Sequence, residues 1–502
     1  MLLPEALRQS TARSGRHLAV VHGAQRLSYE ALWADVCAAA GYWRRAGLAP
    51  GERVALILAN GIEAIVTFYS VWLAGGVVVP LNAQAKSRDF GHWIAHSGAR
   101  FLVHDAANTE VSASLAHLES VPACIAVGGE APGGAAPWSE VIARREAPQP
   151  LALAREQLAM LLYTSGTTGR PKGVMLSHGN LEANIESVVQ YLELGPGDSI
   201  VSLLPFYYSY GNSVLHTHLS VGAAIVLEPN LVFPHAVVES LARERATGFS
   251  GVPSTFALLL SRVALEKYDL GGLRYLTQAG GAMAPALATR LKAAVPNARL
   301  FVMYGQTEAT SRLTYLPPER LLEKLGSAGI PIPGVEIRVR DEEGRLLPAG
   351  EPGEVWVRGG NVMLGYWRDE EATRSVLVEG WLKTGDLGHL DPEGYLFLVG
   401  RRSDMIKTGA HRVNPKDIEE VIAELPAVAE VAVAGIEDEM LGQVIKAFVV
   451  PAPGRDFDVN AVKAHCRDRL AAFKIPRHIE VVASLPKTAS GKVRRVELAN
   501  KT

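Results

Sequence analysis

The sequence predicts an α/β protein with a large N-terminal domain of parallel-type sheets, a β-rich subdomain at the end of that domain, and a small α+β C-terminal domain. Its 502 residues allow two to four domains at about 150 residues each. Apolar residues make up 48% of the chain and charged residues 20%, which is a globular composition. Helix and strand patterns alternate to about residue 315, and short strands with turns follow.

The first elements are a hairpin and a helix. Residues 18–29 alternate around His22-Gly23-Ala24 and predict a β-hairpin. Ser28 is the expected N-cap of a helix whose apolar face carries Leu32, Val36, Ala40 and Trp43. Strand 53–58, helix 61–73 and strand 76–80 follow, and this order implies parallel strands buried on both faces. Residues 128–150 are rich in Gly, Ala and Pro and predict a surface loop.

The predicted pattern of helices and strands changes twice in the second half of the chain. Alternation of helices and strands resumes from 158 to about 315. From 335 the segments VEIRVRD, GEVWVRG and GYLFLVG predict a β-rich subdomain. After Arg402 a separate unit is expected, with helices 415–424 and 459–472 and strands 429–435, 444–451 and 478–483.

Charge and cysteine content exclude several classes of protein. Lys and Arg number 50 against 52 Asp and Glu, so the net charge of −2 favours neither nucleic acid nor an anionic membrane as a partner. Cys37, Cys124 and Cys466 are far apart and form no CxxC, which argues for a reducing, cytoplasmic location without a disulfide framework. No signal peptide is expected. The apolar stretch 64–80 is short for a transmembrane segment and fits a buried helix and strand better.

The strongest local signal is an anion-binding loop after a predicted strand. Residues 163–173 read Tyr-Thr-Ser-Gly-Thr-Thr-Gly-Arg-Pro-Lys-Gly. Glycines let backbone N–H groups converge on one anion, hydroxyl groups add donors, and lysine adds positive charge. Because Pro171 stands where a Walker A motif needs glycine, this is not that motif. The expected phosphate-binding residues are Thr164, Ser165, Gly166, Thr167, Thr168, Gly169 and Lys172.

This loop resembles the phosphate loop of the adenylate-forming superfamily, which includes acyl-CoA synthetases, adenylation domains of peptide synthetases and firefly luciferase. Other motifs of the family follow in order: Gly280-Gly281-Ala282, Tyr304-Gly305-Gln306-Thr307-Glu308, Thr384-Gly385-Asp386, Gly400-Arg401, and Pro486-Lys487 through Gly491-Lys492. The resemblance covers nearly the whole chain. It implies an AMP-binding adenylation domain at 1–402, with its β-rich part at about 330–402, a mobile C-terminal domain at 404–502 and a hinge at Ser403.

The resemblance also implies a role for each motif. An acid attacks the α-phosphate of ATP, so the site must supply positive charge and a metal to two anions. Glu308 is the implied Mg²⁺ ligand, and Thr307 donates to a phosphate oxygen. Tyr304 offers its ring to adenine, beside Gly305, Gln306 and the 280–282 segment. Asp386 and Arg401 are the implied ribose contacts.

Lys492 is the implied catalytic lysine, which contacts the substrate carboxylate and the α-phosphate together. The hinge then lets the C-terminal domain rotate, so that Lys492 leaves and the loop 407–412 enters. Two positions depart from the family pattern. Ser403 stands where Asp or Lys is usual, and in the loop Ala410 takes the place of a glycine while Gly409 lies one residue earlier. Gly409, Ala410 and His411 remain the candidates for the thiol tunnel.

The acid pocket is implied to involve 205–213, 252–254, 278–283 and 303–306. Its candidate residues are Tyr207, Tyr208, Ser209, Gly211, Val252 and Met303, although Tyr207, Tyr208 and Tyr210 have an alternative as core aromatics. No acidic residue lies in 205–213 or 250–256. Because a buried ammonium group needs a counter-charge, we expect a carboxylic acid without a free α-amino group.

The implied function is ATP-dependent activation of a carboxylic acid to an acyl-adenylate, followed by transfer to coenzyme A. ATP, Mg²⁺ and coenzyme A are the expected cofactors, and fatty acid metabolism is the expected setting. The phosphopantetheine thiol of an acyl carrier protein is the alternative acceptor. A non-catalytic nucleotide-binding protein is a third hypothesis, and a homodimer stays open.

Overall fold

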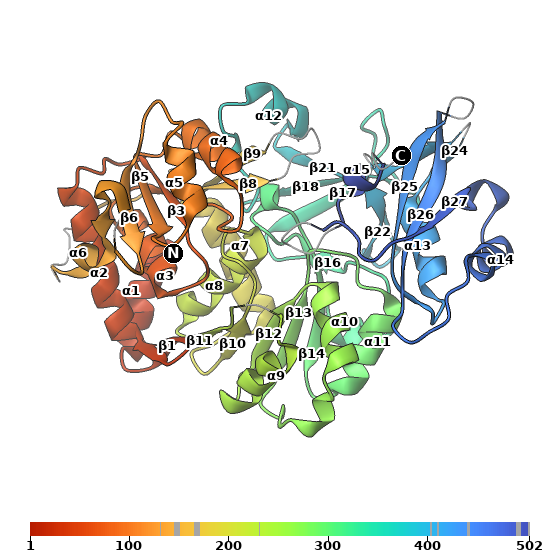
Figure 1. The fold of residues 1–502 in the computed structure, drawn as a ribbon, viewed down its shortest axis with the longest axis horizontal. Coiled ribbons are helices and arrows are strands. Elements are labelled where there is room, and N and C mark those ends of the chain that lie inside the picture. The colour runs from red at the N-terminus through yellow and green to blue at the C-terminus, as the bar shows by residue number, and fades with distance from the viewer. Residues whose placement is uncertain are drawn as a thin grey trace.

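A computed structural model describes residues 1–130, 132–144, 151–164, 171–229, 231–401, 404–408, 411–438, 442–487 and 493–499. Within these residues the strands form four sheets (Figure 1). Two large sheets and a smaller β-rich sheet make up the N-terminal part, and the fourth sheet belongs to the C-terminal part. The predicted α/β class with a large N-terminal and a small C-terminal domain is confirmed.

The first large sheet has the strand order β19-β9-β8-β4-β3-β5-β6-β7. The predicted parallel pair is present, because β3 pairs with β4 around helix α3 (Ile62–Leu73). Strands β8 and β9 form an antiparallel hairpin that brackets residues 165–171. The strands are β3 (Arg53–Ile57), β4 (Val77–Pro80), β5 (Phe101–Asp105), β6 (Ala123–Val127), β7 (Ala136–Pro137), β8 (Leu158–Thr164), β9 (Lys172–Ser177) and β19 (Gly365–Tyr366).

The second large sheet has the order β16-β15-β14-β13-β12-β10-β11-β1-β2. Its central strands β14, β13, β12, β10, β11 and β1 are parallel, and the predicted hairpin β1–β2 closes one edge. The strands are β1 (Leu18–His22), β2 (Gln25–Ser28), β10 (Ser199–Ser202), β11 (Ala224–Leu227), β12 (Gly248–Gly251), β13 (Tyr275–Gln278), β14 (Arg299–Tyr304), β15 (Thr314–Leu316) and β16 (Ile330–Pro331).

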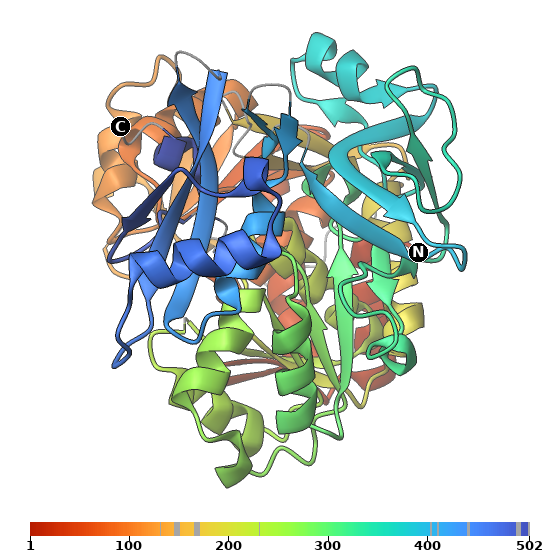
Figure 2. The same cartoon turned by 90° about the vertical axis from the view of Figure 1, so that its right-hand side faces the viewer.

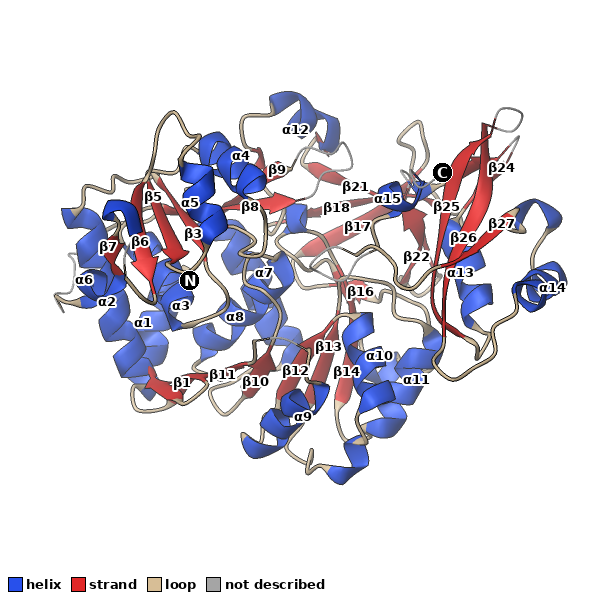
Figure 3. Cartoon of the chain, viewed as in Figure 1, coloured by secondary structure: helices blue, strands red, loops and turns tan. Residues whose placement is uncertain are grey.

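Helices separate and cover the two large sheets (Figure 3). Helices α2 (Tyr29–Arg45), α3, α7 (His178–Leu192) and α8 (Ser209–Val221) contribute to one core that both sheets share. Helices α4 (Ser87–Ser97) and α5 (Thr109–Leu115) cover the outer face of the first sheet, and α9 (Pro234–Arg243), α10 (Pro253–Arg262) and α11 (Pro285–Ala294) cover that of the second. As predicted, Ser28 caps α2, accepting a hydrogen bond from the Ala31 amide. Helix α1 (Leu3–Ser14) packs on α8.

The β-rich part and the C-terminal part lie beside each other above the second sheet (Figure 2). The β-rich sheet contains β17 (Val335–Arg340), β18 (Gly353–Gly359), β20 (Leu377–Val378), β21 (Trp381–Leu390) and β22 (Leu396–Arg401), with helix α12 (Glu370–Val376). The C-terminal sheet contains β23 (Ile406–Thr408), β24 (His411–Val413), β25 (Val428–Asp438), β26 (Gly442–Pro451) and β27 (His478–Val481), with helices α13 (Pro415–Ala423), α14 (Val459–Arg469) and α15 (Arg495–Ala499).

The expected loop at 128–150 is wrong in part. Strand β7 extends the first sheet there, and helix α6 (Trp138–Ile142) follows it. The buried side chain of Val141 explains the difference, because its apolar surface joins the shared core. Cys37, Cys124 and Cys466 are all unpaired. Within the described residues, none of the helices combines the length and the apolar character that a bilayer crossing requires.

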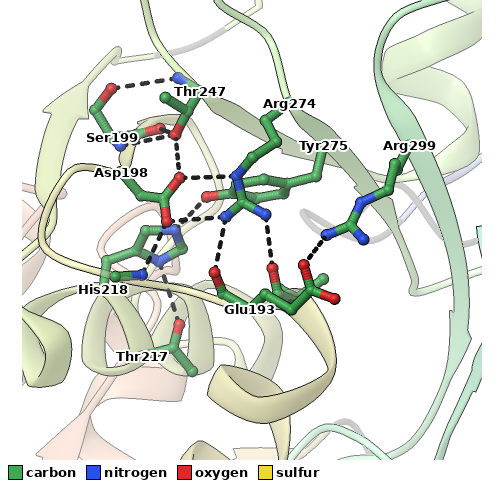
Figure 4. Close-up of polar contacts among 11 residues, drawn as sticks. Glu193, Asp198, Ser199, Thr217, His218, Thr247, Arg274, Tyr275 and Arg299 are labelled. Carbon is green, nitrogen blue, oxygen red and sulfur yellow. Dashed lines mark hydrogen bonds and ion pairs between the residues drawn. The ribbon is translucent and has the colours of Figure 1, made fainter.

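A polar network ties the amino-terminal ends of the central strands together (Figure 4). Arg274 donates to both carboxylate oxygens of Asp198, at 3.1 and 2.8 Å, and to the carbonyl of Leu192 at 2.9 Å. Thr247 donates to Asp198 as well. These contacts join the amino-terminal ends of β10, β12 and β13 to the end of α7. They fix the register of the three strands, and so they also fix the relative positions of the carboxyl ends.

Three buried histidines make stability depend on pH. Burial lowers the pKa of His178 to about 4, of His216 to about 3 and of His218 to about 4. As the pH falls through 6.5 the unfolded chain binds protons at these positions while the folded chain does not, so stability is lost. Between pH 7 and pH 5 we expect each histidine to cost about 2 kcal/mol in the free energy of unfolding.

Urea unfolding at pH 7 and pH 5 measures this loss. His216→Leu should reduce it by about 2 kcal/mol, because the leucine cannot bind a proton in either state. His235→Leu is the control, because His235 is exposed on α9. An equal loss in wild type and His216→Leu would contradict the assignment.

Candidate active site

The candidate site lies at the carboxyl ends of the parallel strands in the second large sheet. Strands β10, β12, β13 and β14 run parallel in neighbouring positions. The segments that follow them begin at 203, 252, 279 and 305, and these contain most of the predicted pocket and nucleotide motifs. In open α/β sheets the carboxyl ends of parallel strands form the usual binding crevice. The fold therefore brings together segments that begin 102 residues apart in the sequence.

One junction of the site is built around the carboxylate of Asp386. Tyr304 donates its hydroxyl to Asp386 Oδ2 at 2.6 Å, and Arg401 Nε donates to Oδ1 at 3.0 Å. Asp386 is 6% exposed. Burial, and then the charge of Asp386, raises the pKa of Tyr304, and Asp386 raises that of Arg401. Tyr304 therefore stays a hydrogen-bond donor and Arg401 stays charged.

A second junction joins Lys172 to Glu308 through Tyr366. The Tyr366 hydroxyl donates to Glu308 Oε1 at 3.0 Å, and the Lys172 ammonium lies 4.8 Å from the centre of the Tyr366 ring. Pairing of β19 with β9 holds Tyr366 beside Lys172. Burial and the neighbouring Glu308 raise the pKa of Tyr366, so its hydroxyl keeps its proton. One tyrosine thus positions a cation and a carboxylate that the sequence places 136 residues apart.

The start of helix α8 lies beside Thr307, next to the Glu308 junction. Thr307 donates its hydroxyl to Ser209 Oγ at 3.2 Å. Asn60, which follows β3, fixes the preceding loop by donating to the carbonyl of Leu204 and accepting from the amide of Phe206. Tyr207 and Tyr208 are half-buried, with ring centres 4.5 Å apart. The positive end of the α8 dipole therefore lies beside Thr307.

The remaining pocket candidates separate into two groups. Val252 packs close to the 280–282 segment: a Cβ added at Gly280 would lie 3.1 Å from the Val252 side chain. Gln278 donates a hydrogen bond to the carbonyl of Gly281 in the same segment. Gly211 and Met303 instead pack into the protein. A Cβ on Gly211 would meet the Pro205 carbonyl oxygen at 2.3 Å, and the Met303 sulfur accepts a hydrogen bond from Tyr191.

Several predicted residues lie outside the described part of the structure. These are Ser165, Gly166, Thr167, Thr168, Gly169, Ser403, Gly409, Ala410 and Lys492. Thr164 ends β8, and the backbone of His411 pairs with that of Thr408. The neighbouring lysine of the last motif, Lys487, forms an ion pair of 2.5 Å with Glu430.

Sequence reasoning missed Tyr366. It stands in Leu-Gly-Tyr-Trp, a short apolar string without the polar cluster that marks the other motifs. Its function depends on pairing between β19 and β9, two strands 188 residues apart at their ends that no local pattern connects. The signal that remained was weak: a tyrosine directly after a glycine, in a chain with 14 tyrosines.

Two family models match the chain. The model described as AMP-binding enzyme matches residues 7–367, and the one described as AMP-binding enzyme C-terminal domain matches residues 417–492. A feruloyl-CoA synthase from an Amycolatopsis species is 36% identical over 97% of this chain and 96% of its own.

Solved structures agree with these matches. The o-succinylbenzoate CoA synthetase of Bacillus subtilis, solved with the acyl-adenylate intermediate OSB-AMP, superposes with a TM-score of 0.87 at 29% identity, covering 99% of this chain and 98% of its own. An amide bond synthetase from Marinactinospora thermotolerans has a TM-score of 0.90 at 31% identity, covering 99% of each chain.

Asp386→Ala should weaken nucleotide binding with the fold intact. The substitution removes the acceptor of Tyr304 and the partner of Arg401, and hydrogen bonds to charged groups contribute about 1.5–3 kcal/mol each. We expect the Kd for ATP, measured by isothermal titration calorimetry, to rise about 10- to 100-fold. Asp341→Ala, which changes a 19% exposed aspartate of the β-rich part that pairs with Arg345, is the control and should leave the Kd unchanged. Equal affinity in wild type and Asp386→Ala would remove Asp386 from the nucleotide site.

Proposed function

The chain belongs to the AMP-binding enzyme family, and from that premise we propose how its residues divide the chemistry of one acid–thiol ligase site. The enzyme activates a carboxylic acid with ATP to an acyl-adenylate, releases pyrophosphate, and passes the acyl group to the thiol of coenzyme A. The observation that carries the proposal is the pair of junctions, Asp386 with Tyr304 and Arg401, and Tyr366 with Lys172 and Glu308. After Asp386, the charge of Glu308 also raises the pKa of Arg401, so the two junctions lie near each other.

The described residues divide into two functional groups. Tyr304, Asp386 and Arg401 would hold the adenosine, since Asp386 has a carboxylate that accepts from hydroxyls and Arg401 remains 45% exposed. Lys172 and Thr307 would face the phosphates, as an ammonium group and a hydroxyl donor suit anionic oxygens. Lys172 and Thr307 would thus supply positive charge and a donor where two anions must approach each other.

Glu308 would hold Mg²⁺. Its carboxylate is half-buried, and one oxygen takes a hydrogen bond from Tyr366. Among the described residues no lysine, arginine or histidine forms an ion pair with it. A hard carboxylate that keeps one oxygen for a cation fits a metal that needs only one or two protein ligands. When bound, Mg²⁺ supplies positive charge to the phosphate oxygens.

We further propose that Lys492, on a mobile unit at 404–502 hinged at Ser403, brings the acid and the α-phosphate together. Lys487 is not a candidate for this role, because it is paired with Glu430. The unit from 1 to 402, with its β-rich part from about 330, would hold the nucleotide throughout. Three unpaired cysteines fit a reducing compartment, so the cytoplasm is the proposed location.

The acid would lack a free α-amino group. No carboxylate lies in 205–213 or 250–256 to pair with an ammonium group. The relatives described above are named for feruloyl and o-succinylbenzoate, which are aromatic acids, whereas a long-chain-fatty-acid–CoA ligase of Bacillus subtilis is 29% identical to this chain. Because the feruloyl-CoA synthase is the more similar of the two CoA ligases at 36% identity, an aryl or aryl-alkyl acid is the proposed substrate class in place of a fatty acid.

An amine acceptor is a second candidate. The amide bond synthetase covers 99% of this chain, and the loop 407–412 departs from the usual pattern at Gly409 and Ala410, where the thiol would enter. The carrier-protein thiol remains a third acceptor, since it presents the same phosphopantetheine arm as coenzyme A.

A panel of acids with ATP and Mg²⁺ tests the proposal. Each acid is offered alone, with coenzyme A, with a phosphopantetheinylated carrier protein and with a primary amine, and mass spectrometry detects adenylate, thioester and amide separately. The expected result is adenylate from acids without an α-amino group and thioester with coenzyme A. A preference for an α-amino acid over its deaminated analogue would overturn the acid assignment.

Lys492→Ala should separate the two half-reactions. Adenylate formation should fall about 10²- to 10³-fold, as for the loss of one transition-state donor. Thioester formation from synthetic acyl-adenylate and coenzyme A should stay near the wild-type rate, because AMP already is a good leaving group. Stopped-flow or quench measurements of each half-reaction give the two rates.

Two variants control this experiment. Lys487→Ala removes a neighbouring lysine that pairs with Glu430, and both rates should stay unchanged. Ala410→Trp should show the reverse pattern, with normal adenylate formation and blocked thioester formation. Equal impairment of both steps by Lys492→Ala would contradict a single site served by two domain positions.

A further inference from the structure

Arg312 is a buried cation that the proposed chemistry does not use. It follows η3 (Thr307–Ala309), and its side chain is 1% exposed, which makes it one of the three largest fully buried side chains among the described residues. A guanidinium group stays charged at any pH at which the protein is folded. Its charge therefore needs a partner inside the protein.

The described residues give Arg312 no carboxylate. Its Nη1 donates to Ser311 Oγ, and its Nε has no hydrogen-bond acceptor. The guanidinium carbon lies 4.3 Å from the centre of the Tyr210 ring. Within the described part of the chain no Asp or Glu forms an ion pair with it, and only Glu146 and Glu439 of all carboxylate side chains lie outside that part.

Arg312 adjoins the acid pocket. Tyr210, on which it stacks, follows Ser209, and Ser209 accepts the hydrogen bond from Thr307. The hydroxyl of Tyr210 donates to the carbonyl of Thr277 on β13 at 2.8 Å. Burial raises the pKa of Tyr191, on α7, to about 12, and the neighbouring charge of Arg312 opposes that rise.

The backbone is strained to place this arginine. Thr310 and Ser311 have φ of +55° and +102°, a region that non-glycine residues avoid. Asn361 holds the turn by donating to the carbonyls of Ala309 at 3.1 Å and Arg312 at 2.8 Å. A Cβ on Gly305 would lie 1.8 Å from the Ser311 carbonyl oxygen, so the turn also requires that glycine. Such strain persists where a side chain must be presented in one position.

We propose that Arg312 binds a second anionic group on the acid, so that the preferred substrates are acids with a further carboxylate or comparable anionic oxygen group at the end away from the reacting carboxyl. This rests on the proposed function and names its substrate class. The planar fork of arginine binds a carboxylate through two parallel hydrogen bonds, and the unpartnered Nε is one of the two donors such a contact needs. Tyr210 covers one face of the guanidinium.

Matched pairs of acids test the proposal in the wild-type enzyme. 4-Carboxycinnamate is compared with 4-methylcinnamate, and adipate with hexanoate, by kcat/KM for pyrophosphate release. We expect the diacid to exceed its partner at least 10-fold in one pair or both. A preference for the monoacid in both pairs would overturn the proposal. If no acid of any kind releases pyrophosphate, the proposed function itself fails.

Variants of Arg312 test the residue. Arg312→Met keeps the length without the charge and should lower kcat/KM for the diacid about 10²-fold, as for the loss of one partner of a buried charge pair, with the monoacid within threefold of wild type. Arg312→Lys keeps the charge without the fork and should fall in between. Arg338→Met is the matched control, because Arg338 stacks on Trp381 with 40% exposure and lies in the β-rich part. Equal loss for diacid and monoacid in Arg312→Met would overturn the proposal, and the wild-type comparison decides it if neither variant folds.

Discussion

The charge of Asp386 sets the main constraint on the structure around the site. A buried carboxylate costs several kcal/mol unless charged or hydrogen-bonding partners surround it. Its partners come from different elements: Tyr304 ends β14 of the second large sheet, and Arg401 ends β22 of the β-rich sheet. The two sheets must therefore stay in one relative position for Asp386 to remain satisfied. Arg401 is also the last described residue before Ser403, so the same contact fixes the point from which the C-terminal part departs.

A second constraint is the placement of positive charge at the start of β9. Lys172 stacks on Tyr366, whose hydroxyl is taken by Glu308, so the ammonium group and the carboxylate are held apart by one ring. Direct contact would neutralise both groups and leave neither for a phosphate or a metal. The polar network of Asp198 and Arg274 lies at the opposite ends of the strands and keeps their register. The network that holds the strand register thus lies at the amino-terminal ends of the parallel strands in the second sheet, and the candidate site lies at their carboxyl ends.

Much of the fold and most of the nucleotide motifs were predictable from the sequence, because the strongest sequence signals are local. The hairpin at 18–29, the Ser28 cap and the βαβ unit at 53–80 depend on short-range periodicity and capping, and all three are present. The nucleotide motifs are short polar strings that follow strands. Tyr366 and Arg312 were missed, because their places depend on tertiary contacts: strand pairing for Tyr366 and a buried stack on Tyr210 for Arg312. Helix α6 was wrongly expected to be a loop, because its formation depends on the burial of Val141. The acid pocket is built from four distant segments, and no local pattern reports its shape.

The central claim is that the acid's own oxygen attacks the α-phosphate of ATP. An acid labelled with ¹⁸O in both carboxylate oxygens tests this directly, with ATP and coenzyme A as the other substrates. Attack forms the bond from a carboxylate oxygen to the α-phosphorus and expels pyrophosphate, and thiol attack on the acyl carbon then leaves that oxygen on AMP. The account predicts AMP with one ¹⁸O and unlabelled pyrophosphate by mass spectrometry. Unlabelled AMP, or label recovered in orthophosphate, would contradict it.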